Sequence, residues 1–250
     1  MIRHLPQLTY PEVEALRATR PVVLLPLGAI EAHGPHLPLE TDTLLSLELA
    51  RRAGEALIAI GTNAVIAAAI PFSVADYASG FAGTLSLPPA TALALIRDVG
   101  IGLHRMGFTS LCFVNSHLDP AHAAVLREAK SAIEAATHSK VAFPDQLEPR
   151  WGRTLSEEYK RGACHAGSYE TSLLMVSDRA SVRDAERAHL PKLDINLAFA
   201  MKDGKRTFEE AGALRAYFGD PASATVEEGE WLYQRLVTMV VTTVQETFSL

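Results

Sequence analysis

Residues 21–42 read PVVLLPLGAIEAHGPHLPLETD, and this stretch decides how the fold is interpreted. It opens with VVLLPLG at 22–28, a continuous apolar run that is typical of a short strand buried on both faces. Glu31, His33, His36 and Asp42 follow within a short loop that contains prolines. Acids and imidazoles so close behind a buried strand indicate a functional site at the end of that strand.

Strand-like and helix-like segments alternate along the rest of the chain. Apolar runs of strand length recur at 63–72, 109–117 and 140–144. Helical spacing of apolar residues is found at 9–20, 41–57, 88–108, 119–138 and 225–248, and 167–177 begins a further helix or mixed segment. This alternation predicts an α/β fold with a mostly parallel sheet covered by helices on both faces. With no repeat or linker in the sequence, we expect one domain over residues 1–250.

Composition excludes several classes of function. Of the 250 residues, 48% are hydrophobic, which suits a globular core. The formal charge of −6 offers no basic surface to nucleic acid or to an anionic membrane. We find neither the apolar core of a signal peptide nor an apolar run long enough to span a bilayer. Two cysteines without a CxxC pair are typical of a reduced, cytoplasmic protein.

Polar clusters follow the predicted strands. EAH at 31–33 follows the first strand, FSVADY at 72–77 follows the second, and NSH at 115–117 ends the third. Ligands of open α/β sheets bind beyond the carboxyl ends of the strands. We therefore expect these three clusters to gather at one edge of the sheet.

The spacing within the first cluster suits a metal site. Glu31 and His33 are two residues apart, so in an extended segment both side chains point to the same face. Asp42 can fold back over them after a loop stiffened by prolines. Imidazole and carboxylate together are ligands for zinc, manganese or iron. The alternative is that these are surface polar groups, with Asp42 acting as a helix cap.

Further acids and histidines occur later in the chain. His117 ends the third strand and Asp119 follows it, while CHAGSYETS supplies His165 and Glu170. Each also has a structural interpretation: a strand-end histidine is often hydrogen-bonded in a core, and Glu170 can lie on a solvated helix face. If the carboxylates converge, they repel one another unless cations compensate them. Two divalent metals would balance the charge and generate hydroxide from a bridging water, and Asp42 would suit a bridge between them.

Four sequence blocks resemble the creatininase family, the creatinine amidohydrolases and their relatives. LPLGAIEAHGPHLPLETD is similar to the family's G-[ST]-x-E-Q-H-G-P-H-L-P-x-x-[TV]-D, and FAGTLSL is similar to F-P-G-T-[IL]-[ST]-L. VNSHLDPAH stands where the family has N-G-H-G-G-N or N-G-H-Y-E-N, and HAGSYETSLLM resembles H-A-G-x-x-E-T-S. The blocks keep their order over roughly residues 22–176.

The resemblance implies a three-layer α/β/α sandwich with a mostly parallel central sheet, and a two-metal hydrolase acting on the C–N bond of a cyclic amide or formamide. It assigns two zinc or manganese ions, with iron as a further candidate. His165 is implied as proton donor to the leaving nitrogen, and Glu170 is assigned to the catalytic group as well as to the metal. The metal ligands by matched position are Glu31, His33, Asp42 and His117, with either Glu170 or Asp119 completing the set and Glu170 favoured.

Several positions depart from the family pattern. The glycines and last asparagine of N-G-H-G-G-N are lost in NSHLDP, and Asp76 and Tyr77 replace a Glu-His pair. We expect the substrate pocket to involve Asp76, Tyr77, Ser116 and Trp151. A small-molecule amide other than creatinine is the expected substrate, because the sequence lacks the tyrosine of N-G-H-Y-E-N.

Two other functions stay open at this point. One is a catalytically inactive member of the fold that binds a small molecule. The other is a metal-independent serine hydrolase that uses Ser116, although the G-x-S-x-G elbow is absent. The resemblance also implies a homo-oligomer, with a hexamer as one form. His36 belongs to the family motif, and we expect it to brace the loop rather than bind metal.

Overall fold

A computed structural model describes residues 2–250 and contains a five-stranded sheet in the order β1-β3-β2-β4-β5. Every pairing in this sheet is parallel. The strands are β1 (Arg3–His4), β2 (Val22–Leu27), β3 (Ala64–Ile66), β4 (Ser110–Asn115) and β5 (Val141–Ala142). The parallel sheet that the alternating pattern predicts is therefore confirmed.

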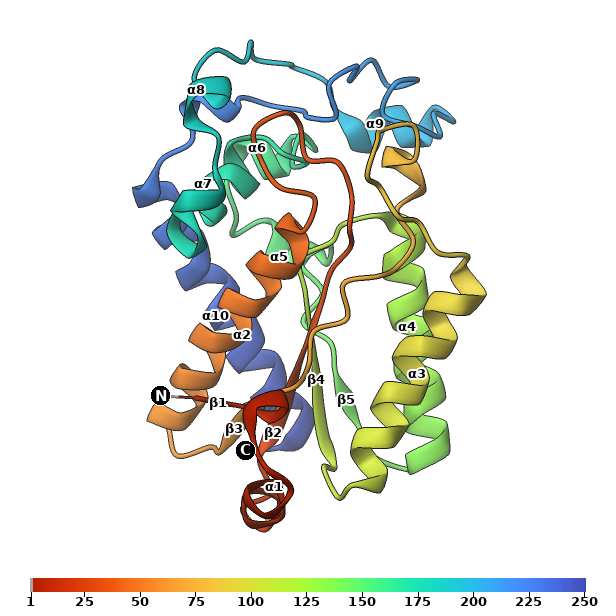
Figure 1. The fold of residues 1–250 in the computed structure, drawn as a ribbon, viewed down its shortest axis with the longest axis vertical. Coiled ribbons are helices and arrows are strands. Elements are labelled where there is room, and N and C mark those ends of the chain that lie inside the picture. The colour runs from red at the N-terminus through yellow and green to blue at the C-terminus, as the bar shows by residue number, and fades with distance from the viewer. Residues whose placement is uncertain (1) are drawn as a thin grey trace.

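Helices cover both faces of the sheet and build up its upper edge (Figure 1). α2, α7 and α10 cover one face, and α3 and α4 cover the other, so the predicted three-layer α/β/α arrangement is confirmed (Figure 1). The short helices α6, α8 and α9 gather at the end opposite α1. The helix bounds are α1 (Tyr10–Arg17), α2 (Thr41–Ala59), α3 (Pro89–Arg105), α4 (Pro120–Thr137), α5 (Pro149–Gly152), α6 (Glu157–Lys160), α7 (Ser168–Ser177), α8 (Asp184–Arg187), α9 (Leu197–Lys202) and α10 (Val226–Phe248).

Two of the predicted strands are shorter in the structure than in the sequence pattern. β3 ends at Ile66, although the apolar run continues to Phe72. The backbone beyond β3 still bonds to β2, since the Ile70 N–H donates to the Pro26 carbonyl, but without a regular ladder. β5 has two residues, and Pro144 soon after it cannot donate to a ladder. Pro144 therefore limits the regular pairing of β5.

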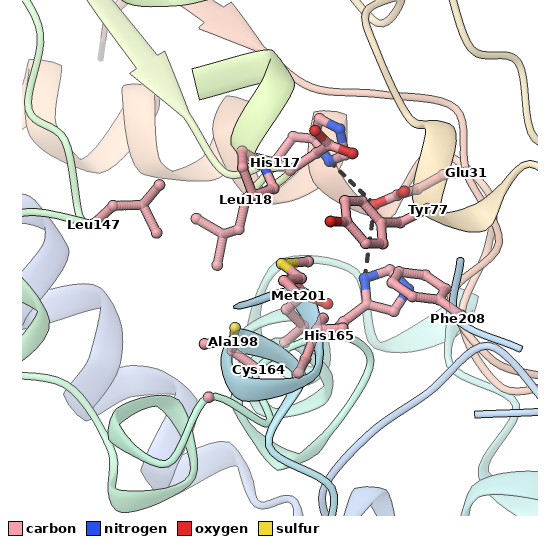
Figure 2. Close-up of a pocket in the computed structure, with 15 residues that line it drawn as sticks. Glu31, Tyr77, His117, Leu118, Leu147, Cys164, His165, Ala198, Met201 and Phe208 are labelled. Atoms are coloured by element: carbon pink, nitrogen blue, oxygen red, sulfur yellow. Dashed lines mark ion pairs between the residues drawn. The ribbon is translucent and has the colours of Figure 1, made fainter. Parts of the chain in front are cut away.

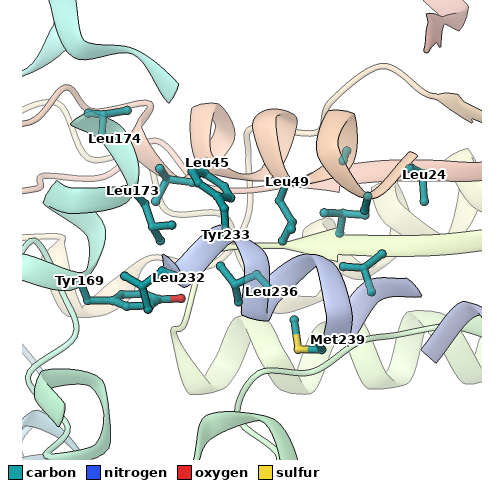
Figure 3. Close-up of a cluster of buried hydrophobic side chains, with 14 of the residues drawn as sticks. Leu24, Leu45, Leu49, Tyr169, Leu173, Leu174, Leu232, Tyr233, Leu236 and Met239 are labelled. Atoms are coloured by element: carbon teal, nitrogen blue, oxygen red, sulfur yellow. The ribbon is translucent and has the colours of Figure 1, made fainter. Parts of the chain in front are cut away.

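The core is divided by the sheet into two apolar clusters. One joins the sheet to α2, α7 and α10, and Tyr233, Leu45 and Leu173 meet inside it (Figure 3). The other joins the opposite face to α3 and α4 through residues such as Phe113 and Ile96. Burial on both faces explains why β2 reads as an uninterrupted apolar run, because all six of its residues are buried.

The helices that flank the site begin at the carboxyl edge of the sheet. α2 begins at Thr41, which places Asp42 in its first turn. α4 begins at Pro120 directly after β4, and α7 begins at Ser168, so Glu170 lies in its first turn. Within residues 2–250, no helix combines the length and the apolar character that a bilayer crossing requires.

Candidate metal centre

The loop after β2, the loop after β4 and the first turns of α2 and α7 bring five predicted ligands together. Glu31 is 3% exposed, Asp42 1% and Glu170 2%. His33 and His117 are buried beside them. Three carboxylates and two imidazoles therefore share a space that water hardly reaches, and burial of this kind is costly unless the charges are compensated.

Asp42 lies between the two histidines. Its Oδ1 is 3.3 Å from Nε2 of His33, and its Oδ2 is 3.0 Å from Nδ1 of His117. The two remaining acids occupy opposite ends of the cluster. Glu31 Oε1 is 3.1 Å from Nδ1 of His117, and Glu170 Oε2 is 3.6 Å from Nε2 of His33.

Backbone carbonyls fix the orientation of both imidazoles. Nδ1 of His33 lies 3.0 Å from the carbonyl oxygen of Glu31, and Nε2 of His117 lies 2.7 Å from that of Val74. A carbonyl oxygen only accepts, so each of these ring nitrogens donates. The other nitrogen of each neutral ring is then a bare lone pair, and this is the form in which imidazole binds metal.

The lone pairs point at carboxylate oxygens that also have nothing to accept. Among the described residues, His33 Nε2, His117 Nδ1 and both carboxylate oxygens of Asp42 are buried without a hydrogen-bond partner. Acceptors facing acceptors need a cation or a proton between them. Two triads within ligand distance share Asp42: Glu31, Asp42 and His117 form one, and His33, Asp42 and Glu170 form the other. The residues present therefore fit divalent cations, with Asp42 common to both triads.

The pKa directions are those of a cluster in which protons compensate the carboxylates. Burial alone acts to lower the pKa of His33, but Asp42, Glu170 and Glu31 outweigh it and raise the pKa to about 10. Burial acts to raise the pKa of Asp42, but His33 and His117 hold it well below its usual range. Burial raises the pKa of Glu170 to about 8. Metal binding at this site must therefore displace protons.

Asp119, the alternative to Glu170 as the fifth ligand, has another role in the structure. It is the N-cap of α4, and its Oδ1 accepts from the backbone N–H groups of Ala121, at 2.7 Å, and His122, at 3.2 Å. Burial raises its pKa. It is absent from the ligand triads of the described residues, whereas Glu170 belongs to one of them. The geometry thus favours Glu170 as the ligand.

His165 lies beside the cluster, and one of its ring nitrogens bonds to a backbone carbonyl, as in the two ligand imidazoles. Its Nε2 donates to the carbonyl oxygen of Ala32 at 2.9 Å, and its Nδ1 is 3.7 Å from Glu31 Oε1. Its ring lies 4.4 Å from that of His33 and 4.4 Å from that of Phe208 between centroids. Burial and then the charge on His33 lower its pKa to about 4. A neutral imidazole therefore presents a free Nδ1 toward the carboxylates.

The structure adds a layer of supporting residues that sequence reasoning missed. Asn115 clamps the backbone of His117, accepting its N–H at 3.1 Å and donating to its carbonyl oxygen at 2.7 Å. His122 Nε2 donates to Asn115 Oδ1 at 2.9 Å and its Nδ1 accepts from Ser73 at 2.6 Å. Asn115 opens the quoted NSH motif and could have been noticed there. His122 and Ser73 give no signal in one sequence, because only the fold brings them together.

His36 is buried and braces the loop, as expected from the sequence. Its Nε2 lies 2.9 Å from Thr171 Oγ1, which ties the loop to α7 next to Glu170. Burial and the neighbouring His33 lower the pKa of His36 to about 3, so it stays neutral.

A cavity of about 160 Å³ opens from the cluster toward solvent, and Glu31, His117, His165 and Glu170 line its inner end. Figure 2 shows Leu118 and Met201 between this end and Leu147. Tyr77 lines the cavity, and its role in substrate binding stays a prediction.

The other three residues predicted to bind substrate do not line this cavity. Asp76 instead accepts a hydrogen bond from the Ser86 hydroxyl at 2.5 Å. Trp151 packs against the core cluster around α10, with the Arg150 guanidinium 4.1 Å over its ring. Ser116 is buried, and in the described part of the chain no histidine nitrogen bonds to its hydroxyl. A role of Asp76, Ser116 and Trp151 in substrate binding therefore stays a prediction that this cavity does not support.

The chain is similar to creatininase-family proteins both in sequence and in fold. The model of the creatininase family, described as creatinine amidohydrolase, matches residues 6–244. A mycofactocin precursor peptide peptidase of Mycobacterium tuberculosis is 30% identical over 232 residues, which cover 89% of this chain and 84% of that protein. A creatinine amidohydrolase of Pseudomonas putida is 26% identical over 260 residues, covering 97% and 96%. A manganese creatininase structure matches with a TM-score of 0.78 at 21% identity and covers 99% of both chains.

Proposed function

The chain belongs to the creatininase family of hydrolases, and from that premise we propose that it is a two-metal amidohydrolase cleaving the C–N bond of a small-molecule amide. One observation carries the proposal: two imidazoles whose donor nitrogens are held by backbone carbonyls aim bare lone pairs at the two oxygens of Asp42. These nitrogen and oxygen atoms have no hydrogen-bond partner, so a cation could bind between them without breaking a hydrogen bond.

In this proposal Glu31 and His117 would hold one cation, His33 and Glu170 would hold the other, and Asp42 would contribute to both. Zinc and manganese suit this donor set, and iron is a further candidate. Divalent cations bound there would supply Lewis acidity, which activates water and polarises an amide carbonyl. The protein keeps the ligand atoms in place through the carbonyls of Glu31 and Val74 and through the Asn115 clamp on His117.

His165 would move the proton. Its Nε2 stays bonded to Ala32, and its Nδ1 faces the reacting edge of the cavity. Burial acts to lower the pKa of His165, which favours a neutral ring near pH 7 that can take a proton from the attacking water. That proton then goes to the leaving nitrogen as the C–N bond breaks and the new C–O bond remains. The products are a carboxylic acid and an amine.

The names of the relatives suggest which amides should be tested as substrates. One is a creatinine amidohydrolase and another is a precursor peptide peptidase, so the panel contains a cyclic amide, a formamide and a short peptide amide. The homo-oligomer, the cytoplasmic location and the single-domain organisation expected from the sequence stay predictions.

The test begins with elemental analysis of protein purified without added metal. We expect about two divalent ions per chain, loss of hydrolysis after chelation, and recovery on adding zinc or manganese. His33→Ala is expected to lose both metal and turnover.

Two outcomes would overturn the proposal in different ways. Turnover that survives chelation but disappears in Ser116→Ala would favour the serine hydrolase. Bound metal without turnover of any amide in the panel would favour an inactive member that binds a small molecule.

A further inference from the structure

We propose that the cavity selects neutral amides that carry one apolar group about the size of a benzene ring close to the scissile bond. This inference rests on the proposed amidohydrolase function and specifies its substrate class. It depends on the walls of the cavity rather than on the metal ligands.

The cavity walls beyond the ligand cluster are apolar side chains from separate segments. Figure 2 shows Leu118 and Leu147 on one side, with Met201 and Phe208 nearer to His165. The apolar lining residues used in this argument are Leu118, Pro120, Leu147, Leu197, Met201 and Phe208. An apolar substituent gains free energy by leaving water for such walls, whereas a charged one loses its hydration.

The apolar wall offers a charged substituent little compensation. The acids of the cavity are Glu31, Asp119 and Glu170, and none of the described lining residues is Lys or Arg. In the proposed function Glu31 and Glu170 would be offset by the cations they hold, so a substrate carboxylate beside the wall would meet Asp119 and find no Lys or Arg partner. An ammonium group would have Asp119 as its acidic partner in the wall, but it would lose its hydration against the apolar side chains.

The volume of the cavity limits the size of the group. At about 160 Å³, the whole cavity is close to the roughly 150 Å³ apolar cavity that accommodates benzene, and its inner end has to hold the amide as well, so one group the size of a benzene ring is the upper limit. Leu118 directly follows the predicted ligand His117, so the apolar wall begins next to the reacting atoms. The apolar group therefore fits one or two bonds from the amide carbonyl rather than at the end of a long chain.

A matched series of amides tests the preference. Phenylacetamide and hexanamide supply the apolar group, while the monoamide of adipic acid and 6-aminohexanamide place a carboxylate or an ammonium at the far end of a similar chain. We expect kcat/KM for the two apolar amides to exceed that for the charged ones by roughly 10- to 100-fold. Equal values, or a preference for either charged amide, would overturn the inference.

A substitution in the wall should change this preference. Met201→Arg places a cation in the cavity, so we expect the ratio of adipic monoamide to hexanamide turnover to rise by roughly tenfold or more. The matched control is Phe199→Arg on the same helix, since Phe199 is 68% exposed and does not line the cavity. As a second variant, Ala198→Phe fills the cavity and should reduce phenylacetamide turnover more than acetamide turnover. No change of ratio in either wall variant would contradict the inference.

Binding measurements distinguish a failure of this inference from a failure of the proposed function. If no amide is hydrolysed, the amidohydrolase proposal fails, and calorimetric titration with phenylacetamide and adipic monoamide still reports on the cavity. Preferential binding of phenylacetamide then supports the apolar selectivity alone. If polar amides such as creatinine are hydrolysed and the apolar series is not, the selectivity fails while the amidohydrolase proposal stands.

Discussion

The ligand cluster and the cavity wall lie at the same edge of the sheet but are built in different ways. The ligands stand beside strand ends and in the first turns of long helices, and backbone carbonyls orient the histidines. Much of the wall comes from the irregular stretch around α9, a helix of six residues, and from Phe208 beyond it. The wall thus depends on a segment outside the sheet.

Because of this difference, the chemistry at the ligand cluster and the choice of substrate depend on different parts of the protein. The sheet and its long helices fix where charge and metal can lie, and small movements there disturb every ligand. The α9 segment touches the cavity but supplies none of the ligand triads found in the described residues. Its side chains can therefore change the choice of substrate without changing the chemistry.

Removing the bridge should have the largest effect. Asp42→Asn keeps the shape of the side chain but removes the charge shared between the histidines. We expect less than about two metal ions per chain and a loss in kcat/KM on the order of 10³-fold. Elemental analysis and kinetics measure both, with Glu40→Gln as the control because Glu40 is exposed just before α2. Full metal content in Asp42→Asn would break the assignment of Asp42 as a bridge.

Loosening the support of His117 should have a smaller effect. His122→Ala removes the bond to Asn115, which clamps the His117 backbone. We expect metal affinity to fall about 10- to 100-fold, with His122→Gln recovering part of it. Competition with a chromogenic chelator measures the affinity. His104→Ala, a histidine on α3 that bonds to Ser139, provides the control. Unchanged affinity would show that Asn115 holds the backbone without His122.

The metal-free protein should lose stability as pH rises. The raised pKa values of His33, about 10, and Glu170, about 8, mean that the folded state holds protons that the unfolded chain releases at lower pH. Their stabilising effect is complete below about pH 4.5 for Glu170 and below about pH 6.5 for His33. The contribution of Glu170 is lost as pH rises through about 8, and that of His33 as pH rises through about 10.

We therefore expect the Tm of chelated protein to fall by several degrees between pH 6 and pH 9, because over much of this range the folded state holds protons on Glu170 and His33 that the unfolded chain has released. Metal-loaded protein should show a smaller decrease, because cations replace the protons. Differential scanning calorimetry of the two forms makes the comparison. A fall of equal size in both would contradict a site held by protons in the absence of metal.

The smallest effect on catalysis is expected at Trp151. This side chain packs on the core and does not line the cavity, so Trp151→Phe should leave KM within about twofold. Its cost should instead be about 1 kcal/mol in the free energy of unfolding. Urea denaturation and steady-state kinetics together distinguish the two results. A large rise in KM at unchanged stability would place Trp151 in substrate binding after all.

The sequence predicted the ligand cluster better than the cavity, for a physical reason. Strand-length apolar runs identify β2 and β4, and the carboxyl-edge rule then places Glu31, His33 and His117 together. Glu170 was ambiguous because a carboxylate in the first turn of a helix is equally typical of a solvated face. Trp151 and Asp76 do not line the cavity, and the sequence could not show this because side-chain direction in a short loop or helix depends on tertiary contacts that have no periodic signal.

α10 has a consequence for the order in which the protein matures. It packs on both α2 and α7, the helices whose first turns carry Asp42 and Glu170. On a ribosome, α10 emerges after both of these helices, so a nascent chain stopped before Val226 has the ligands but lacks their common support. We expect the chain to take up metal after its release from the ribosome. A chain whose translation stalls within α10 should therefore have a low metal content.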